Sequence, residues 1–322
     1  MILKVKIMGL VFIIVFCGFL GVSTKVLGQD SKVFLDDKLG QPEKSADNLI
    51  VNVDLINVLF TVTDKRGRLV TDLDKKEIKL FEDSKPQAIT NFSKETDLPL
   101  TIAMLIDTST SIRDRFKFEQ EAASDFLYRT LRSRKDKALL ITFDSAIELV
   151  QDYTDSPEIL GKAIRQIRPG GGTKMLDAIF LACQEKLKSE TGRKIIILIS
   201  DGDDNLSLET VNSTLEMAQR SDVSIFAVST NSSGFFSISA PRADKLLKKL
   251  AEETGGRAFF PFKAEDLSHS FQDISAELRS QYSVAYRSTN TLRDGTFRAI
   301  KIEPDRKNLK VKSRRGYYAP RG

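Results

Sequence analysis

Three short segments carry oxygen-bearing side chains of the types that bind a hard cation. One is an Asp-x-Ser-x-Ser segment (residues 107–111), whose alternating oxygens can face one point if the backbone is extended. A threonine follows a glycine triplet (residues 170–172), and an acidic residue lies in a Ser-Asp-Gly segment (residues 200–202). Carboxylates and hydroxyls suit Mg²⁺ or Mn²⁺ and are poor ligands for softer metals. The candidate metal ligands are Asp107, Ser109, Ser111, Thr173 and Asp201.

From Leu98 onward the sequence has the pattern of an α/β fold, in which apolar strands alternate with amphipathic helices. Residues 195–199 are five consecutive aliphatic residues, which indicates a strand covered on both faces. The predicted fold is a doubly wound, mostly parallel, six-stranded Rossmann-like sheet. We expect strands at 100–106, 138–143, 147–150, 195–199, 223–228 and 257–260, and helices at 115–131, 157–167, 175–187, 208–219, 243–253 and 264–280.

The strand order decides whether the acidic residues meet. In a sheet of order 3-2-1-4-5-6, the first and fourth strands are neighbours at the topological switch point, where ligands bind in such folds. Asp107 and Asp201 follow these two strands, so we expect them to flank one crevice. They should lie at the rim of the sheet and outside its core.

The regions on either side of the α/β domain (98–280) have the pattern of antiparallel strands. Before it, in residues 49–97, we expect strands at 49–63, 77–82 and 88–92, with a turn at 83–86. After it, in residues 281–322, we expect strands at 282–287, 297–302 and 309–312, with Asp294-Gly295 as a hairpin turn. Neither region can build a sheet core alone. We therefore predict that both form one discontinuous β-sandwich, into which the α/β domain is inserted.

The N-terminus has the features of an export signal. Lys4 and Lys6 precede an apolar run at residues 7–22, and Gly28 offers a small residue before a cleavage site. We predict a signal peptide at 1–28, a polar linker at 29–48, and a secreted or periplasmic protein. The alternative is a membrane anchor, but the apolar run is shorter than the roughly 20 residues of a spanning helix. Cys183 is the only cysteine after cleavage, which excludes an internal disulfide.

Composition excludes two other classes of protein. The chain has 322 residues, which favours two domains, and it is 41% hydrophobic and 29% charged, which excludes a disordered protein. Its formal charge is +5, but removal of residues 1–28 leaves 46 basic and 44 acidic side chains. That balance gives no electrostatic basis for binding nucleic acid.

The five candidate ligands resemble the metal-ion-dependent adhesion site (MIDAS) of von Willebrand factor A (vWFA) domains, and none is substituted. The resemblance covers residues 98 to about 262. The flanks, with an Asp-x-x-Gly at 64–67 and Arg-Gly-Tyr-Tyr-Ala-Pro at 315–320, resemble the secreted bacterial vWFA-related family. The resemblance implies a divalent ion, usually Mg²⁺, held directly by Ser109, Ser111 and Thr173 and partly through water by the aspartates. One coordination position would stay open for a partner's carboxylate.

This arrangement is physically reasonable. Mg²⁺ takes six oxygens at about 2.0 to 2.1 Å, and neutral hydroxyl ligands leave its charge incompletely neutralised. An Asp or Glu of a partner then completes both geometry and charge. The predicted function is an exported, metal-dependent adhesion or scaffold module that binds a protein, and not an enzyme. The alternatives are a metal-independent scaffold acting through the β-sandwich and, less favoured, a hydrolase, for which no Gly-x-Ser-x-Gly motif or zinc ligand set is found.

Other motifs carry weaker functional signals. The segment 170–174 lacks the spacing of a phosphate-binding P-loop. His269, the single histidine, lies in a predicted helix and is expected to be structural. Asp203 and Asp204 are expected to solvate a loop. The Gly-Phe-Phe segment 234–236 is either a partner-binding loop or a loop packed beneath its neighbours.

Overall fold

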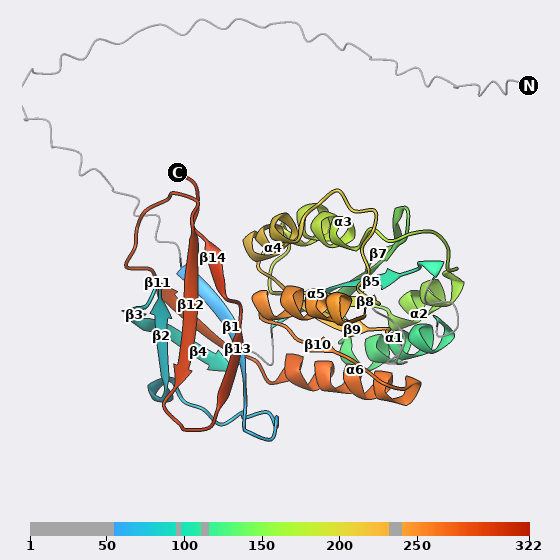
Figure 1. Cartoon of the computed structure of the whole chain (residues 1–322). Coiled ribbons are helices and arrows are strands. Elements are labelled where there is room, and N and C mark those ends of the chain that lie inside the picture. The colour runs from blue at the N-terminus through green and yellow to red at the C-terminus, as the bar shows by residue number, and fades with distance from the viewer. Residues whose placement is uncertain (1–54, 95–97, 111–115, 232–239) are drawn as a thin grey trace, which may run out of the picture. The chain divides into compact units, whose positions relative to one another are not determined.

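The computed structural model describes residues 55–94, 98–110, 116–231 and 240–322, all of which belong to one compact unit (Figure 1). The predicted signal peptide and linker, Ser111 and the segment 234–236 lie outside these residues. Within the described ranges, no helix combines the length and apolar character needed to cross a membrane.

The central sheet has six strands: β5 (Leu100–Asp107), β6 (Lys137–Phe143), β7 (Ile147–Thr154), β8 (Arg193–Ser200), β9 (Val223–Ser229) and β10 (Ala258–Phe259). Their spatial order is β10-β9-β8-β5-β6-β7, which confirms the predicted order and places β5 beside β8. All neighbouring pairs are parallel except β6 and β7, which are antiparallel. The predicted doubly wound, Rossmann-like fold is therefore confirmed.

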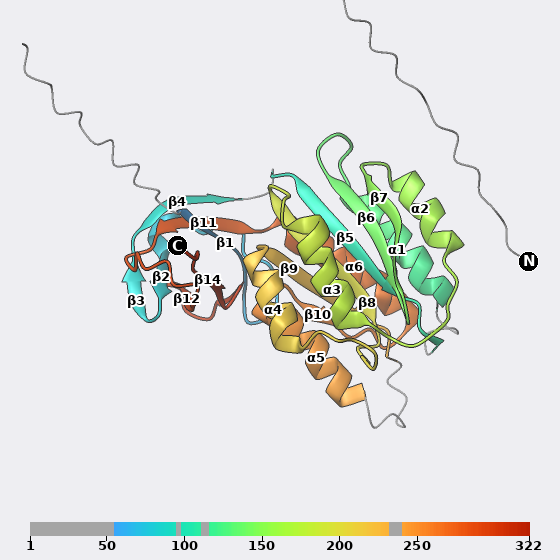
Figure 2. The same cartoon turned by 90° about the horizontal axis from the view of Figure 1, so that it is seen from above.

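Helices cover both faces of this sheet (Figures 1 and 2). One face packs against α1 (Phe116–Thr130), α2 (Pro157–Gln166) and α6 (Ala264–Arg279). The other packs against α3 (Met175–Leu181), the π-helix Ala182–Leu187 that continues it, α4 (Val211–Arg220) and α5 (Ala240–Glu253).

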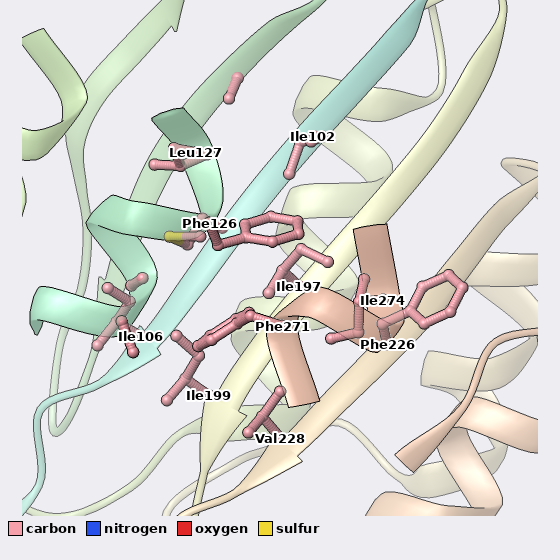
Figure 3. Packing of buried hydrophobic residues seen from close by; sticks show 14 of the residues in the cluster. Ile102, Ile106, Phe126, Leu127, Ile197, Ile199, Phe226, Val228, Phe271 and Ile274 are labelled. Atoms are coloured by element: carbon pink, nitrogen blue, oxygen red, sulfur yellow. The ribbon is translucent and has the colours of Figure 1, made fainter. Parts of the chain in front are cut away.

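The aliphatic run of β8 explains how the sheet is held on both sides. Ile195, Ile197 and Ile199 point into the first core, while Ile196 and Leu198 point into the second. This alternation confirms that the strand is covered on both faces. Figure 3 shows the first core, in which side chains of β8 and β9 meet those of α1 and α6.

Local sequence signals fix the ends of two helices. Ser156 caps α2 by accepting a hydrogen bond from the backbone N–H of Ile159, and Pro157 occupies the first turn. After α5, Gly255 adopts φ of +85°, the left-handed conformation that glycine allows at the end of a helix. At Gly256 an added Cβ would lie 2.0 Å from the backbone oxygen of Ile225. A side chain there would push the segment after α5 away from β9.

Eight further strands form two four-stranded antiparallel sheets. Their bounds are β1 (Leu55–Thr63), β2 (Ile78–Glu82), β3 (Lys85–Gln87), β4 (Ile89–Lys94), β11 (Tyr282–Arg287), β12 (Phe297–Pro304), β13 (Lys310–Ser313) and β14 (Gly316–Tyr318). The orders are β13-β1-β11-β4 and β14-β12-β2-β3, so each sheet mixes strands from before and after the α/β region. Side chains of both sheets, including Phe60, Leu80, Tyr282 and Ile300, share one core. The discontinuous sandwich is confirmed.

The predicted hairpin at Asp294-Gly295 is wrong. The strands on either side of it, β11 and β12, lie in different sheets and do not pair. Asp294 does form a local turn, in which its Oδ1 accepts from the backbone N–H of Thr296, and it makes an isolated antiparallel bridge with Arg321. The predicted turn is therefore present, but a local turn motif does not determine which strands pair with each other.

The tight hairpin of the sandwich lies instead between β2 and β3. Asp83 and Ser84 have φ of +46° and +66°, the left-handed conformation that favours Asp, Asn and Gly. The predicted turn was longer, at 83–86, whereas Lys85 and Pro86 belong to β3. β14 was not predicted at all.

One buried arginine joins the two points at which the chain enters and leaves the α/β region. Nη2 of Arg193 donates to the carbonyl oxygen of Leu98 (3.0 Å). Nη1 donates to the carbonyl oxygen of Leu278 and to Oε1 of Gln281 (3.4 Å). The two connections to the sandwich therefore lie close together.

Candidate metal centre

The ends of β5 and β8 bring the first and third predicted segments together. The register pairs Ile106 with Ile199, so Asp107 ends one strand beside Ser200 at the end of the other. Oγ of Ser200 donates to Oδ2 of Asp107 (2.7 Å), and the backbone N–H of Ser109 donates to Oδ1 of Asp107 (2.8 Å). Asp201 follows Ser200 directly, and its charge acts on Asp107. The structure thus places Asp107, Ser109 and Asp201 side by side.

Backbone hydrogen bonds connect the glycine loop to the Asp107 loop. The N–H of Gly170 donates to the carbonyl oxygen of Thr108 (2.6 Å), and the N–H of Thr110 donates to the carbonyl oxygen of Gly171 (3.3 Å). Gly171 has φ of +85°, and an added Cβ would lie 2.8 Å from Oγ of Ser145. This position therefore requires glycine for both its conformation and its close approach.

Thr173 connects the glycine loop to the loop after β8. Its backbone N–H donates to Oδ1 of Asn205 (3.0 Å). Its carbonyl oxygen accepts from the N–H groups of Asn205 (3.3 Å) and Leu206 (3.0 Å). Hydrogen bonds therefore link the three segments in sequence, with Thr173 attached to the loop that begins at Asp201.

The described candidate ligands are buried. The exposed fraction is 0% for Asp107, 3% for Ser109 and for Thr173, and 8% for Asp201. They lie at the carboxyl ends of the strands as expected, but they are less accessible than the predicted rim position implied, because the connecting loops pack against them. Ser111 lies outside the described residues, and the structure does not test its role.

The electrostatics of Asp107 fit a cation site. Its pKa is raised from 3.8 to about 6, primarily because burial disfavours the charged form. Hydrogen bonds from Ser200 and Ser109 lower the pKa, and repulsion from Asp201 raises it. A divalent cation beside the two carboxylates would compensate both burial and repulsion. Two carboxylates and the hydroxyls of Ser109 and Thr173 are a donor set suited to a hard ion.

In the described ranges, no group of three or more His, Cys, Asp or Glu side chains lies close enough to hold a metal ion. The predicted site contains only two such residues, Asp107 and Asp201, and its other ligands are hydroxyls. His269 lies in α6 and is exposed.

Sequence reasoning missed the residues that support the ligands. Ser200 orients Asp107 and also accepts from the N–H of Gly202 (3.0 Å). Asp204, expected only to solvate a loop, accepts from the N–H of Leu176 (2.9 Å) at the start of α3. It therefore acts as a helix cap supplied by a different loop. No local signal identifies it, because the two residues are 28 positions apart.

Hydrogen bonds attach the loop after β8 to α3, and the side chain of Leu208 in this loop is exposed to solvent. Oδ1 of Asp177 accepts from the N–H groups of Leu208 (2.9 Å) and Glu209 (2.8 Å). Oγ of Ser207 accepts from the N–H of Asp177 (3.1 Å). The side chain of Leu208 is nevertheless 91% exposed, and that of Leu206 is 43% exposed. The loop is thus ordered by polar contacts and presents apolar side chains outward.

Comparison with known proteins agrees with this geometry. Residues 102–203 match the profile of the von Willebrand factor type A domain family. No curated protein matches the chain.

Three solved structures illustrate the likeness. Proximal thread matrix protein 1 from the mussel byssus, with a zinc-occupied MIDAS motif, is 19% identical, with a TM-score of 0.50 over 62% of this chain and 50% of that one. The vWF domain of the type V pili tip protein Mfa5 from Porphyromonas gingivalis is 13% identical, with a TM-score of 0.44 over 56% of this chain and 95% of that one. The PilB minor pilin from Streptococcus sanguinis is 12% identical, with a TM-score of 0.45 over 57% of this chain and 62% of that one. The chain spans about half the length of the mussel structures it matches.

The matched segment contains the site and the sheet that positions it. It begins in β5, includes the glycine loop, and ends just after Asp201. The strand order, the helices on both faces and the fold shared with the mussel protein agree with that match. This chain therefore contains a von Willebrand factor type A domain.

Proposed function

We propose that this protein is an exported, metal-dependent module that binds a protein partner. Asp107, Ser109, Ser111, Thr173 and Asp201 would hold Mg²⁺ or Mn²⁺, and a carboxylate of the partner would complete the site. When bound, the ion supplies positive charge and a free coordination position. The observation that carries the proposal is the convergence of two carboxylates with hydroxyl donors at the ends of β5 and β8. Export rests on the N-terminal sequence pattern.

The residues around the site would hold the ligands ready for the ion. Ser200 and the backbone N–H of Ser109 orient the Asp107 carboxylate. Asn205 fixes the backbone of Thr173 at the start of the segment leading into α3. Such supporting contacts reduce the ordering that binding would otherwise require. The mussel protein with the same fold holds zinc in its MIDAS motif, which supports a divalent cation at this position.

The surface beside the site supports a protein as the ligand. Leu208 is almost fully exposed on a loop held by hydrogen bonds, and Leu206 is partly exposed two residues before it. A partner that covered these two leucines would bury apolar surface, and the hydrogen bonds that fix the loop backbone reduce the ordering that this contact requires. An acidic residue next to an apolar one in the partner would match this surface.

Partner capture with and without a chelator tests the proposal. The mature protein would be immobilised and exposed to exported proteins of its source in Mg²⁺. The expected result is a bound partner that is released by EDTA, is recovered when Mg²⁺ is restored, and is not captured by Thr173→Ala. Capture that persists in EDTA would contradict the metal-dependent mechanism and favour a scaffold acting through the sandwich. Hydrolysis of ester or phosphate substrates that is lost in Asp201→Ala would overturn the non-enzymatic role.

A further inference from the structure

A cavity lies away from the candidate metal centre, where two strand edges approach each other. It has a volume of about 660 Å³ and is lined by residues at β10 and α5 and by residues of β12 and β13. β10 is one edge strand of the six-stranded sheet, and β13 is one edge strand of a sandwich sheet. Directly after β13, Arg314 forms an antiparallel bridge with Thr254, so the edge available for pairing is that of β13 itself. Edge strands have backbone N–H and C=O groups on one side that can pair with an added strand.

The charged residues lining this cavity are mostly cationic. The one acidic residue is Glu252, and the five basic residues are Lys248, Arg257, Lys301, Lys312 and Arg315. Glu252 lies 3.9 Å from Lys248, and Glu303 lies 2.5 Å from Lys301. All four side chains are between 42% and 71% exposed, so both pairs neutralise the cations only weakly. The lining therefore favours an anionic ligand.

Two of these cations share one buried acid. Arg257 and Lys312 lie 3.8 and 3.7 Å from the carboxylate of Glu277, whose exposed fraction is 2%. The hydroxyl of Thr61 donates to the same carboxylate. The pKa of Lys312 is lowered, mainly because burial disfavours its charge. A second anion on the cavity side would stabilise both cations.

The rest of the lining is largely apolar. Its partly exposed apolar residues are Pro304, Leu309 and Val311, together with Phe260, whose exposed fraction is 44%, while Ile300 and Ile302 belong to the buried core of the sandwich. An ion alone would leave this surface in contact with water. A ligand that carries apolar and acidic groups in alternation would cover the apolar surface and neutralise the cations.

We propose that this cavity binds an extended acidic segment of a partner protein, whose backbone pairs with the open edge of β13. Its acidic side chains would reach the basic residues at the cavity margin, and its apolar side chains would cover the apolar lining. Strand addition of this type obtains affinity from main-chain hydrogen bonds and specificity from alternate side chains. The site is independent of the metal, so failure of the metal proposal would leave it unaffected.

The test uses a fluorescent ten-residue peptide that alternates Glu and Leu, titrated into the mature protein in EDTA and followed by anisotropy. The control peptide has Gln in place of Glu. We expect the acidic peptide to bind about tenfold or more tightly than the neutral one, with a difference that shrinks as salt is added. Equal binding of the two peptides would overturn the proposal.

Variants and a modified peptide locate the site and its mode of binding. Lys248 and Lys301 are exposed, so the double variant K248E/K301E is expected to fold normally and to lose about tenfold or more in affinity for the acidic peptide. The matched control, K162E/K188E, reverses two exposed lysines outside the cavity and should bind as the parent does. N-methylation of alternate peptide amides should abolish binding. Undiminished affinity in K248E/K301E would rule out this cavity, and undiminished affinity of the methylated peptide would rule out strand pairing.

Discussion

The hydroxyl of Ser200 donates a 2.7 Å hydrogen bond to the carboxylate of Asp107, across the boundary between β8 and β5. Both side chains are completely buried. The contact joins two residues 93 positions apart at the switch point of the sheet. It holds Asp107 in place from β8, the strand that Asp201 directly follows. Ser200 therefore acts as a positioning residue for the proposed metal site.

Replacing Ser200 with Ala should weaken Mg²⁺ or Mn²⁺ binding by about tenfold to a hundredfold, as loss of an orienting contact does in other metal sites. Calorimetric titration measures this change. Ser221→Ala removes a similarly buried hydroxyl that contacts the backbone of Cys183, away from the site, and should bind metal normally. Equal affinity of the two variants would show that Ser200 does not position a ligand.

Metal affinity should depend on pH in a defined direction. Burial raises the pKa of Asp107 to about 6, so protons compete with the cation below that pH. Affinity should rise as pH increases from about 5 to 6 and change little from about 7 to 8. Mn²⁺ titrations at these pH values measure the change. An affinity that is constant between about pH 5 and 7 would contradict the involvement of Asp107.

The free energy of unfolding of the metal-free protein should change with pH in the opposite direction to the metal affinity. The folded state holds the Asp107 proton up to a pH of about 6, whereas the unfolded chain releases it near 3.8. Between those values the folded state binds more protons, so this residue makes the free energy of unfolding fall as pH rises. Asp107→Asn should remove that contribution in urea unfolding performed in EDTA. The same pH dependence in the variant would assign the effect to other groups.

Leu208 should contribute to partner binding but not to metal binding. Leu208→Ser removes an exposed apolar contact beside the site and should reduce partner capture about tenfold or more if this leucine is a central contact. Its Mg²⁺ affinity should equal that of the parent. Leu292→Ser, at a sandwich residue that is 64% exposed, is the matched control and should capture the partner normally. Loss of capture in both variants would show that the effect is not specific to this loop.

Arg193 should be important for stability. Arg193→Met removes the side-chain donor of the Leu278 carbonyl and one of the two arginine donors of the Leu98 carbonyl, which also accepts from Nη2 of Arg132; we expect this to cost about 2 to 4 kcal/mol. Urea unfolding measures this loss. Arg168→Met, which changes an exposed arginine, should have little effect. A loss below about 0.5 kcal/mol in Arg193→Met would contradict the role of this contact.

Much of the α/β region could be predicted from sequence because its strands and helices have strong periodic patterns. The aliphatic run at 195–199 identified a doubly covered strand, and the rule for switch points placed Asp107 beside the strand that precedes Asp201. Both inferences depend on regular features of the fold. Both inferences were therefore correct without any knowledge of individual side-chain contacts.

The features that sequence could not predict depend on contacts between distant residues. The neighbours of β11 are β1 and β4 and not β12, so the turn at Asp294 does not make a hairpin. Asp204 caps a helix that begins before it in the sequence, and Ser200 bonds to a residue in another strand. The burial of Asp107 also depends on how loops pack, which no local pattern specifies.

The central claim is tested most directly by calorimetric titration of Mg²⁺ and Mn²⁺ into the mature protein and into Thr173→Ala. We predict that the parent binds one ion and that the variant binds none, while its circular dichroism spectrum is unchanged. Asp107→Ala should lose metal binding as well, and Thr130→Ala, a buried threonine that contacts Ser275, should keep it. Undiminished metal uptake by folded Thr173→Ala and Asp107→Ala would contradict the proposed metal site.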